Sequence, residues 1–463
     1  MGFLSFLTGA MTGSAQRHFA YAIGQGDAEA VNRWFNASLL LHAGLAVLLV
    51  VIGLPFGWYM LDHVLTIPPG RLSTCHVVFL CTLAAVFVNV LAVPFTGMFT
   101  AKQRIFELSA YQFVQTALMF GFAYMLTSIR TDRLAIYAIG VTAIALLITG
   151  LQIARCYLGF KECQFKRLRR QELRCMRELV SFAGWTLFGA MGVVGSNQGI
   201  AFLINIFCGP KLNASFGISN QVSGQMSGVS QGLFNAISPE ITASEGCGNR
   251  DRVITLALRA SKFSTLLACS ILIPVLFEMN TILELWLKEV PSYTATLSAI
   301  MLIAFLIDKM TIGYMAAIGA YGVIAGYQAT LGGALLCAPL IAWYIFYMGG
   351  GIVWAVGVAL LVTRTVCSLG RILWVKHLMQ VPISRWVWGV AVRCMSVVLL
   401  PLGLAVLIHW KSVPSFSRLL ATLLICGACT CVTGWIFGLD RFEREYLISA
   451  IRKGSRLMRQ LYA

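Results

Sequence analysis

Three charged residues stand inside apolar segments that are long enough to cross a membrane. Arg364 lies in the middle of the segment 352–375, and Asp308 and Lys309 lie past the middle of the segment 293–319. A charge at such depth costs about 2.5–3.5 kcal/mol on insertion scales, so each should face water or a partner. Arginine holds phosphate oxygens through two parallel hydrogen bonds, and lysine attracts them as a point charge. Arg364 and Lys309 are therefore candidates for binding an anion.

Other interpretations of these charges stay open. Asp308 could pair with Arg364, or Lys309 with Glu240, and each pair would be an internal one without a ligand. Asp308 is also the one carboxylate that we place deep in an apolar segment, so it is the candidate for binding a coupling proton or Na⁺. Three more arginines lie nearer the ends of apolar segments, and we expect them to extend to the cytoplasmic interface: Arg155, Arg371 and Arg393.

The stretch 181–241 is long enough to cross a bilayer twice, yet it is rich in side-chain amides. Amides cost free energy in lipid unless they are hydrogen-bonded, so we expect this stretch to line a wet or protein-lined interior. As a helix, 218–237 would carry apolar residues such as Ile218, Val222 and Met226 on one face. The other face would carry amides and three glycines at four-residue spacing, Gly224, Gly228 and Gly232.

Two roles fit the amide face. It could be a packing face, because small residues let helix backbones approach closely while amides bond neighbouring helices. We favour a cavity wall, because packing needs small residues but not this many amides. The amides assigned to the wall are Asn197, Gln198, Asn220, Gln221, Gln225, Gln231 and Asn235.

The composition is that of an all-α polytopic membrane protein. Of the 463 residues, 58% are hydrophobic and 11% are charged, and the mean hydropathy is +0.80, whereas a soluble domain carries about a quarter charged residues. We predict one partial helix at the N-terminus and about twelve segments of spanning length. The segments are 36–61, 73–100, 105–126, 134–158, 179–207, 213–243, 255–277, 293–319, 327–347, 352–375, 387–408 and 416–437.

Basic residues predict the orientation. One set of alternate loops and termini holds 23 lysines and arginines and the other holds seven, so the positive-inside rule places the first set and the C-terminus in the cytoplasm. The net charge of +17 suits anionic lipid headgroups, an anionic substrate, or both. We interpret 159–178 as a basic cytoplasmic linker between two groups of helices, and 438–463 as a basic amphipathic tail on the cytoplasmic surface.

The usual catalytic motifs are absent from the sequence. It has no glycine-rich phosphate loop, no His-Glu-x-x-His and no Gly-x-Ser-x-Gly, and its six histidines are isolated. We therefore expect a transporter and not an enzyme, with no cofactor and no metal site. A membrane glycan polymerase or ligase is the alternative from another class, but the external loops are short for holding catalytic residues.

The two halves of the chain resemble each other weakly. Gly-x-Gly-Asp at 24–27 and Gly-x-Gly-Asn at 246–249 each precede a long apolar helix that contains a proline, Pro55 or Pro274. Such duplication is common in secondary transporters, whose substrate path lies at the repeat interface. A full helix, 179–207, precedes the second repeat, whereas Met1 falls inside a helix of the first. We therefore expect that a first helix is missing.

Three stretches carry a resemblance to a known family: SFAGWTLFGAMGVVGSNQGIAFLINIFCGPKLNASFGISNQVSG, FLTGAMTGSAQRHFAYAIGQGD and ILELWLKEVPSYT. They resemble the Wzx-type oligosaccharide flippases of the multidrug/oligosaccharidyl-lipid/polysaccharide exporter (MOP) superfamily, which also contains MATE drug antiporters and lipid II flippases. The resemblance implies two six-helix bundles that face each other across an inverted-V cavity, followed by two extra helices. On this chain the bundles would be 1–158, without the family's first helix, and 179–375, and the extra pair 387–437.

The resemblance also implies a function. It is the transport of undecaprenyl-pyrophosphate-linked oligosaccharide, such as O-antigen, capsule or exopolysaccharide repeat units, across the bacterial inner membrane by alternating access. Arg364 and Lys309 would attract the pyrophosphate. Expected partners are this lipid-linked substrate, anionic lipids and polysaccharide assembly proteins, but no nucleic acid, and we expect a monomer. A MATE-type multidrug or cation antiporter is the alternative, although its cavity would be acidic and aromatic and the deep charges here are mostly basic.

Overall fold

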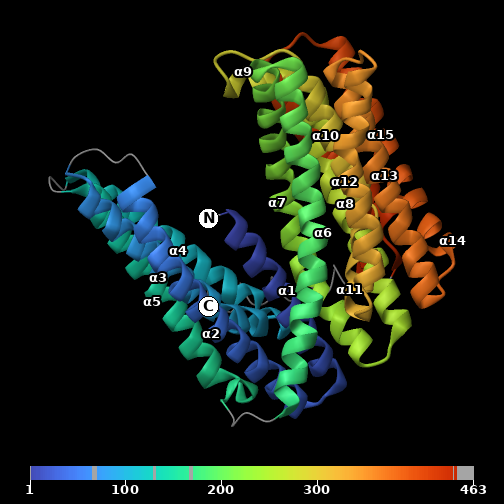
Figure 1. Cartoon of the computed structure of the whole chain (residues 1–463). Coiled ribbons are helices and arrows are strands. Elements are labelled where there is room, and N and C mark those ends of the chain that lie inside the picture. Colours follow the sequence, from blue (N-terminus) through green and yellow to red (C-terminus); the bar gives the residue numbers. More distant parts are fainter. Residues whose placement is uncertain (1, 65–69, 129–131, 166–169, 442, 446–463) are drawn as a thin grey trace, which may run out of the picture. The chain divides into compact units, whose positions relative to one another are not determined.

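The computed structural model describes residues 2–64, 70–128, 132–165, 170–441 and 443–445, and within these ranges it is helical without a strand (Figure 1). Most of the predicted tail, 438–463, lies outside the described residues. The helices are α1 (Gly2–Gln25), α2 (Ala28–Tyr59), α3 (Leu72–Ala101), α4 (Ile105–Met125), α5 (Arg133–Gly159), α6 (Arg170–Cys208), α7 (Pro210–Gly246), α8 (Arg250–Phe277), α9 (Met279–Trp286), α10 (Thr294–Lys309), α11 (Ile312–Tyr321), α12 (Ala325–Tyr347), α13 (Ile352–Met379), α14 (Ile383–Trp386), α15 (Val392–Lys411) and α16 (Phe416–Thr433). Short 3₁₀ or π turns lie at Met60–Val64, Leu126–Ser128, Lys161–Cys163, Val387–Ala391 and Gly434–Gly438.

All twelve predicted segments fall on helices, so the all-α polytopic prediction is confirmed. Among the described residues, nine helices are long and apolar enough to span a membrane, or ten if the bent pair α10 and α11 forms one span. The two predicted segments outside this count are α4, which carries Glu107 near its start, and α7, whose amides lower its hydropathy. The chain is thus a multi-pass membrane protein, and spanning by α4 and α7 stays a prediction.

Contacts divide the chain into two compact units. Unit 1 comprises Met1–Ala190, Asn235–Val253 and Gly319–Ala325, and unit 2 comprises Met191–Phe234, Ile254–Ile318 and Gly326–Ala463. Helices α6, α7, α8, α11 and α12 therefore contribute residues to both units. The division into bundles, linker, extra pair and tail that we expected from the sequence stays a prediction.

In unit 1, α3 packs against α1, α2 and α5 around an aromatic core. Phe19, Phe35 and Phe99 are almost fully buried there, and the Phe35 and Phe95 rings meet edge to face at 5.4 Å between centroids. Aromatic pairs in this geometry are worth about 0.5–1.5 kcal/mol beyond the area that they bury. The core thus fixes α1 to the helices that follow it.

The first part of the predicted linker is bound to unit 1. The Asn32 amide donates to the backbone carbonyls of Glu162 and Gln164 at 2.7 and 2.8 Å, and the Lys102 ammonium donates to the Glu162 carboxylate at 2.7 Å. Burial acts to raise the pKa of Glu162, but the hydrogen bond and charge of Lys102, with smaller contributions, hold it below its usual value. Residues 166–169 lie outside the described ranges.

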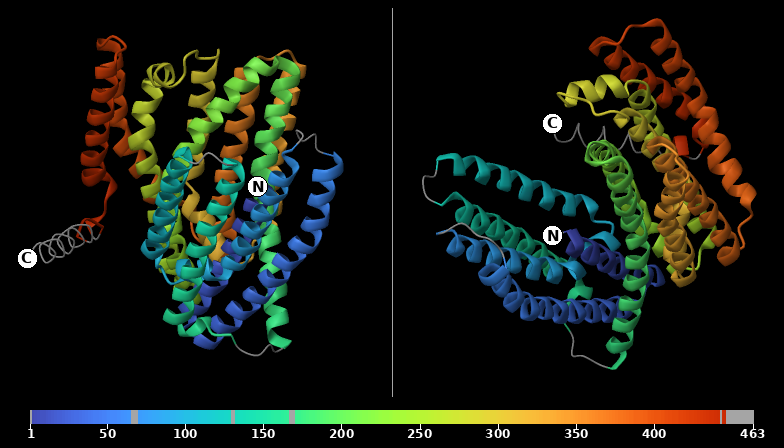
Figure 2. Two further views of the ribbon diagram at one scale, coloured as in Figure 1. Left: turned by 90° about the vertical axis from the view of Figure 1, so that its left-hand side faces the viewer. Right: turned by 45° about the horizontal axis from the view of Figure 1, so that its top comes forward.

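In unit 2, buried ion pairs attach the end of the chain to α8. At the start of α16, Arg418 lies 2.9 Å from the Glu278 carboxylate, which directly follows α8, and the two side chains are 5% and 0% exposed. Lys262 of α8 lies 2.6 Å from Glu443, with 2% and 4% exposed. Figure 2 shows α15 and α16, drawn in orange and red, running side by side. Within unit 2, the two ion pairs therefore tie α16 and the residues that follow it to α8.

Candidate functional site

The candidate site in unit 2 is built around a break between α10 and α11. The two helices are bent by 45° between Lys309 and Ile312. A break inside a membrane leaves backbone carbonyls that must find other donors. Three side chains supply them: Ser368 donates to Ile307 O at 2.7 Å, Arg371 to Asp308 O at 3.1 Å, and Trp386 to Met310 O at 2.9 Å. Helices α13 and α14 thus stabilise the break.

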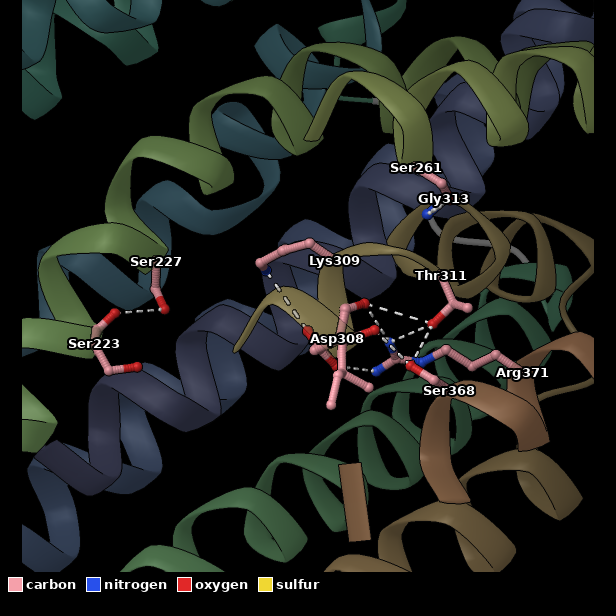
Figure 3. A network of polar contacts seen from close by, with 10 residues as sticks. Ser223, Ser227, Ser261, Asp308, Lys309, Thr311, Gly313, Ser368 and Arg371 are labelled. Carbon is pink, nitrogen blue, oxygen red and sulfur yellow. Dashed lines mark hydrogen bonds and ion pairs between the residues drawn. The ribbon is translucent and has the colours of Figure 1, made fainter. Parts of the chain in front are cut away.

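An ion-pair cluster lies at the same break (Figure 3). The Arg371 Nη2 atom lies 2.8 Å from Asp308 Oδ1, and the Lys309 Nζ atom lies 3.7 Å from Asp308 Oδ2. Arg371 also donates to the Thr311 hydroxyl at 3.2 Å, and that hydroxyl lies 3.1 Å from the Ser368 hydroxyl. Lys309 and Arg371 are both buried. One carboxylate therefore serves two buried cations.

The prediction for Arg371 was wrong. It does not extend toward an interface; it is buried against Asp308, because the break offers a carboxylate, a free carbonyl and a hydroxyl together. The alternative that Asp308 forms an internal ion pair is confirmed, but its partners are Arg371 and Lys309 and not Arg364. The pair of Lys309 with Glu240 was wrong, because Glu240 pairs with Arg252 at 2.8 Å. The sequence did hold a signal, because Ser368 and Arg371 are three residues apart and share a helix face.

The other two arginines of that group lie near helix ends and are partly exposed. Arg155 lies 3.2 Å from Glu107 and is 40% exposed, and Arg393 lies 2.6 Å from Asp440 and is 34% exposed. For Asp440, the hydrogen bond from Arg393 holds the pKa below its usual value. Both arginines therefore form ion pairs at the ends of their helices.

Arg364 differs from Arg371, the other arginine of α13. It is half-buried, and within the part of the chain that the structure describes it makes no hydrogen bond or ion pair. Its charge nevertheless acts on Asp308, as do those of Lys309 and Arg371. Arg371 and Lys309 thus lie within ion-pair distance of the Asp308 carboxylate, and Arg364 adds a third positive charge beyond that distance. The cluster has spare positive charge, which is what an anion site requires.

Helix α7 has the two faces that its sequence predicts. Ile218, Val222 and Met226 pack against a buried cluster that includes Leu272 and Phe305, so the apolar face is part of the core of unit 2. The amides assigned to the wall are mostly on accessible surface. Asn197 and Asn220 are half-buried, and the exposed ones are Gln198, Gln221, Gln225, Gln231 and Asn235.

The glycines show that the amide face of α7 is open within its unit. A Cβ atom built on Gly224, Gly228 or Gly232 meets nothing of unit 2 within 4 Å. A different run of glycines, in α6, makes the close helix contact: a Cβ on Gly192 would lie 2.6 Å from the Gly332 carbonyl of α12. The packing alternative for the α7 glycines therefore fails inside unit 2.

The repeated Gly-x-Gly turns have the same local structure. Gly26 and Gly248 both have φ of +72°. Asp27 accepts a hydrogen bond from Ala30 N at 2.8 Å, and Asn249 accepts one from Arg252 N at 3.1 Å. Each turn thus ends one helix with a left-handed glycine and caps the next with a side-chain oxygen. The predicted internal repeat is confirmed at these turns.

No metal site is present in the ranges that the structure describes: no group of three or more histidine, cysteine, aspartate or glutamate side chains there could hold an ion. The cluster at the α10–α11 break instead combines one carboxylate with several cations. Its surplus of cations suits an anionic group.

Comparisons with known proteins identify the fold. No protein-family model matches the chain, and no curated protein matches it. Among solved structures, the chain is similar to a MATE mutant, with a TM-score of 0.71, 12% identity, and coverage of 82% of this chain and 86% of that one. It is similar to an outward-facing multidrug resistance MATE transporter of the MOP superfamily, with a TM-score of 0.67, 14% identity and coverage of 83% and 85%.

A third solved structure has a different pocket. It is a MOP superfamily transporter from Pyrococcus furiosus, described by the reverse polarity of its binding pocket, with a TM-score of 0.68, 13% identity and coverage of 83% and 85%. At these identities the likeness shows the fold and nothing finer. The chain is a multi-pass membrane protein, and its fold is that of the MATE transporters.

Proposed function

We propose that this protein is a transporter that flips undecaprenyl-pyrophosphate-linked oligosaccharide across the bacterial inner membrane by alternating access. The observation that carries the proposal is the open amide face of α7. Gln221 and Gln225 are exposed on this face, and a Cβ on Gly224, Gly228 or Gly232 would meet nothing of unit 2 within 4 Å. Such a surface suits a substrate with many hydroxyl groups. The sequence resemblance to Wzx-type flippases supports the same substrate class.

The cations at the α10–α11 break supply the charge that a pyrophosphate needs. Arg364 has no carboxylate partner in the described chain and is proposed to hold phosphate oxygens. Lys309, whose ion pair with Asp308 is long at 3.7 Å, is proposed to add a point charge. The sugar units would contact Asn197, Gln198, Asn220, Gln221, Gln225, Gln231 and Asn235.

A coupling proton or Na⁺, if the protein uses one, is proposed to act at Asp308. Because Asp308 already pairs with Arg371 at 2.8 Å, the ion would compete with that arginine. We place the protein in the bacterial inner membrane as a monomer, with its basic loops in the cytoplasm against anionic lipids. Polysaccharide assembly proteins are proposed partners, and no nucleic acid is.

A MATE-type drug antiporter is the second candidate, and the fold itself favours it, since MATE transporters are among its structural neighbours. The sign of the charge at the α10–α11 break discriminates between the two candidate functions. A site for organic cations needs surplus negative charge, whereas here the single carboxylate of Asp308 pairs with both Arg371 and Lys309. A substrate with a pyrophosphate matches that sign and an organic cation does not.

Reconstitution tests the proposal. The full chain is placed in proteoliposomes with a polyprenyl-pyrophosphate oligosaccharide, and an impermeant glycosidase measures how much sugar has crossed. We expect flipping by the wild type, a loss of tenfold or more in Arg364→Ala, and no change in the control Arg104→Ala, whose side chain is 58% exposed. Normal flipping by Arg364→Ala at equal protein level would overturn the assigned site. Efflux of a cationic dye without sugar flipping would establish the antiporter.

A further inference from the structure

Unit 1 contains a cavity that the proposed transport path does not use. Its volume is about 250 Å³, and it is lined by residues of α1, by the start of α6 and by the break between α11 and α12. Arg17, Glu178, Phe182 and Trp185 are among them, with the backbone from Gly322 to Ala325. The basic-residue count places Arg17 outside the apolar segments, but it lies inside α1.

Arg17 is held in place but keeps a free donor. Its Nη2 atom donates to Ala320 O at 3.2 Å, and its guanidinium carbon lies 5.5 Å from the Phe182 ring centroid. Its Nε atom is buried and has no hydrogen-bond partner in the described chain. A buried donor without a partner costs free energy, so its presence points to a bound group.

The helix break is shaped around this guanidinium. Gly322 has φ of +92°, which favours glycine, and a Cβ there would lie 2.1 Å from Arg17 Nη2, so a larger residue would displace the guanidinium. Directly after it begins α12, a helix of 23 residues whose first residue, Ala325, lines the cavity. The N–H groups of a first helical turn have no partners within the helix and favour an anion. Arg17 and the backbone N–H of Ala325 together suit a phosphate.

The cavity also contains a negative charge. Glu178 lines it with a side chain that is 51% exposed, and its ion pair with Arg174 is long at 3.6 Å. The rings of Phe182 and Trp185 line it too, and aromatic faces attract ammonium groups. A purely anionic ligand would be repelled by Glu178. A ligand with a phosphate and an amine would satisfy both ends.

The depth of the cavity indicates where such a ligand comes from. Ala325 is the first residue of one candidate span, Ala325–Tyr347, and Glu178 is near the start of another, Leu173–Cys208. The cavity therefore lies where spans begin, at the level of lipid headgroups, where tryptophan is also enriched.

We propose that this cavity binds the headgroup of a zwitterionic phospholipid, with the phosphate on Arg17 and the amine on Glu178 beside the two aromatic rings. The site is separate from the proposed sugar path, so it stands whether or not the protein flips oligosaccharide. A bound lipid would hold the start of α6 and the segment Gly322–Ala325 together with α1.

Lipid binding to the purified full-length protein tests the site. Native mass spectrometry in detergent measures the retention of phosphatidylethanolamine, phosphatidylglycerol and inorganic pyrophosphate. We expect phosphatidylethanolamine to bind best and Arg17→Ala to weaken it about tenfold or more, with Arg104→Ala unchanged. Equal retention of phosphatidylglycerol, or unchanged binding in Arg17→Ala, would overturn the proposal. Displacement by pyrophosphate that depends on Arg17 would assign the site to a free or substrate phosphate instead.

The carboxylate gives a second and independent test. Glu178→Gln removes the negative charge from a half-exposed side chain, so it should fold even if Arg17→Ala does not. We expect it to weaken phosphatidylethanolamine and strengthen phosphatidylglycerol, so that the preference between them shrinks or inverts. The matched control Glu29→Gln, at a side chain that is 82% exposed, should keep the wild-type preference. An unchanged preference in Glu178→Gln contradicts the proposed role of the amine.

Discussion

Two possible roles of Asp308, counter-ion and binding site for a coupling ion, predict opposite effects of its substitution on stability. If it is the counter-ion of the α10–α11 break, Asp308→Asn will destabilise the protein; if it only binds a coupling ion, stability will hardly change. The substitution removes the charge that Arg371 contacts at 2.8 Å and Lys309 at 3.7 Å. It leaves the backbone carbonyl of residue 308, to which Arg371 also donates.

The expected loss follows from burial. Removing one partner of a buried ion pair typically costs about 3–5 kcal/mol, because the other charge stays buried without compensation. Here two buried cations lose their carboxylate, so the upper half of that range is expected. The hydrogen bonds that remain recover little, since such bonds inside membranes average about 0.6 kcal/mol.

A double-mutant cycle makes the reasoning testable. We would measure the free energy of unfolding in mixed micelles for Asp308→Asn, Arg371→Met and the double variant, and we expect a coupling energy of about 2–3 kcal/mol. The control is Asp440→Asn, because its partner Arg393 is 34% exposed and exposed pairs contribute at most about 1 kcal/mol. A loss below about 1 kcal/mol in Asp308→Asn, or a coupling below about 0.5 kcal/mol, would refute the counter-ion role.

Three further predictions use the same structure. Gly192→Ala should lower the thermal midpoint because its Cβ would lie 2.6 Å from a backbone oxygen of α12, whereas Gly224→Ala should not. The pKa of Glu162 is lowered, so its pair with Lys102 stabilises the protein above the ordinary carboxyl pKa and is lost as pH falls through the lowered value; Lys102→Met should remove that acid-side dependence of unfolding. Arg364→Met should raise the thermal midpoint while abolishing flipping, and a lowered midpoint would show that Arg364 has a partner.

The helical segments and the turns could be predicted from the sequence, because they depend only on residues close together in the chain. The twelve segments follow from apolar runs, and the Gly-x-Gly-Asp and Gly-x-Gly-Asn turns follow from a glycine that adopts positive φ before a capping side chain. These features need no knowledge of distant partners. The amphipathic division of α7 is of the same kind, because helical periodicity places Ile218 and Gly224 on different faces.

Features that depend on distant partners could not be predicted. The break after Lys309 contains no proline, and its stabilising groups, Ser368, Arg371 and Trp386, come from 61 to 76 residues further along the chain. Likewise, the glycines of α6 and α7 have similar spacing. They differ because α12 packs against Gly192, whereas nothing of unit 2 packs against Gly224.

The charge balance at the break connects stability to the proposed function. Lys309 and Arg371 share one carboxylate and Arg364 has no ion pair in the described chain, so the cluster holds uncompensated positive charge. Like charges in a low dielectric repel one another. A sequence selected only for stability would replace Arg364 by an apolar residue, since even a half-buried cation without an ion pair costs free energy. An anion that enters the site recovers that cost and so binds more tightly than it would at a neutral site. The same arginine should therefore weaken the fold and strengthen the binding of a pyrophosphate.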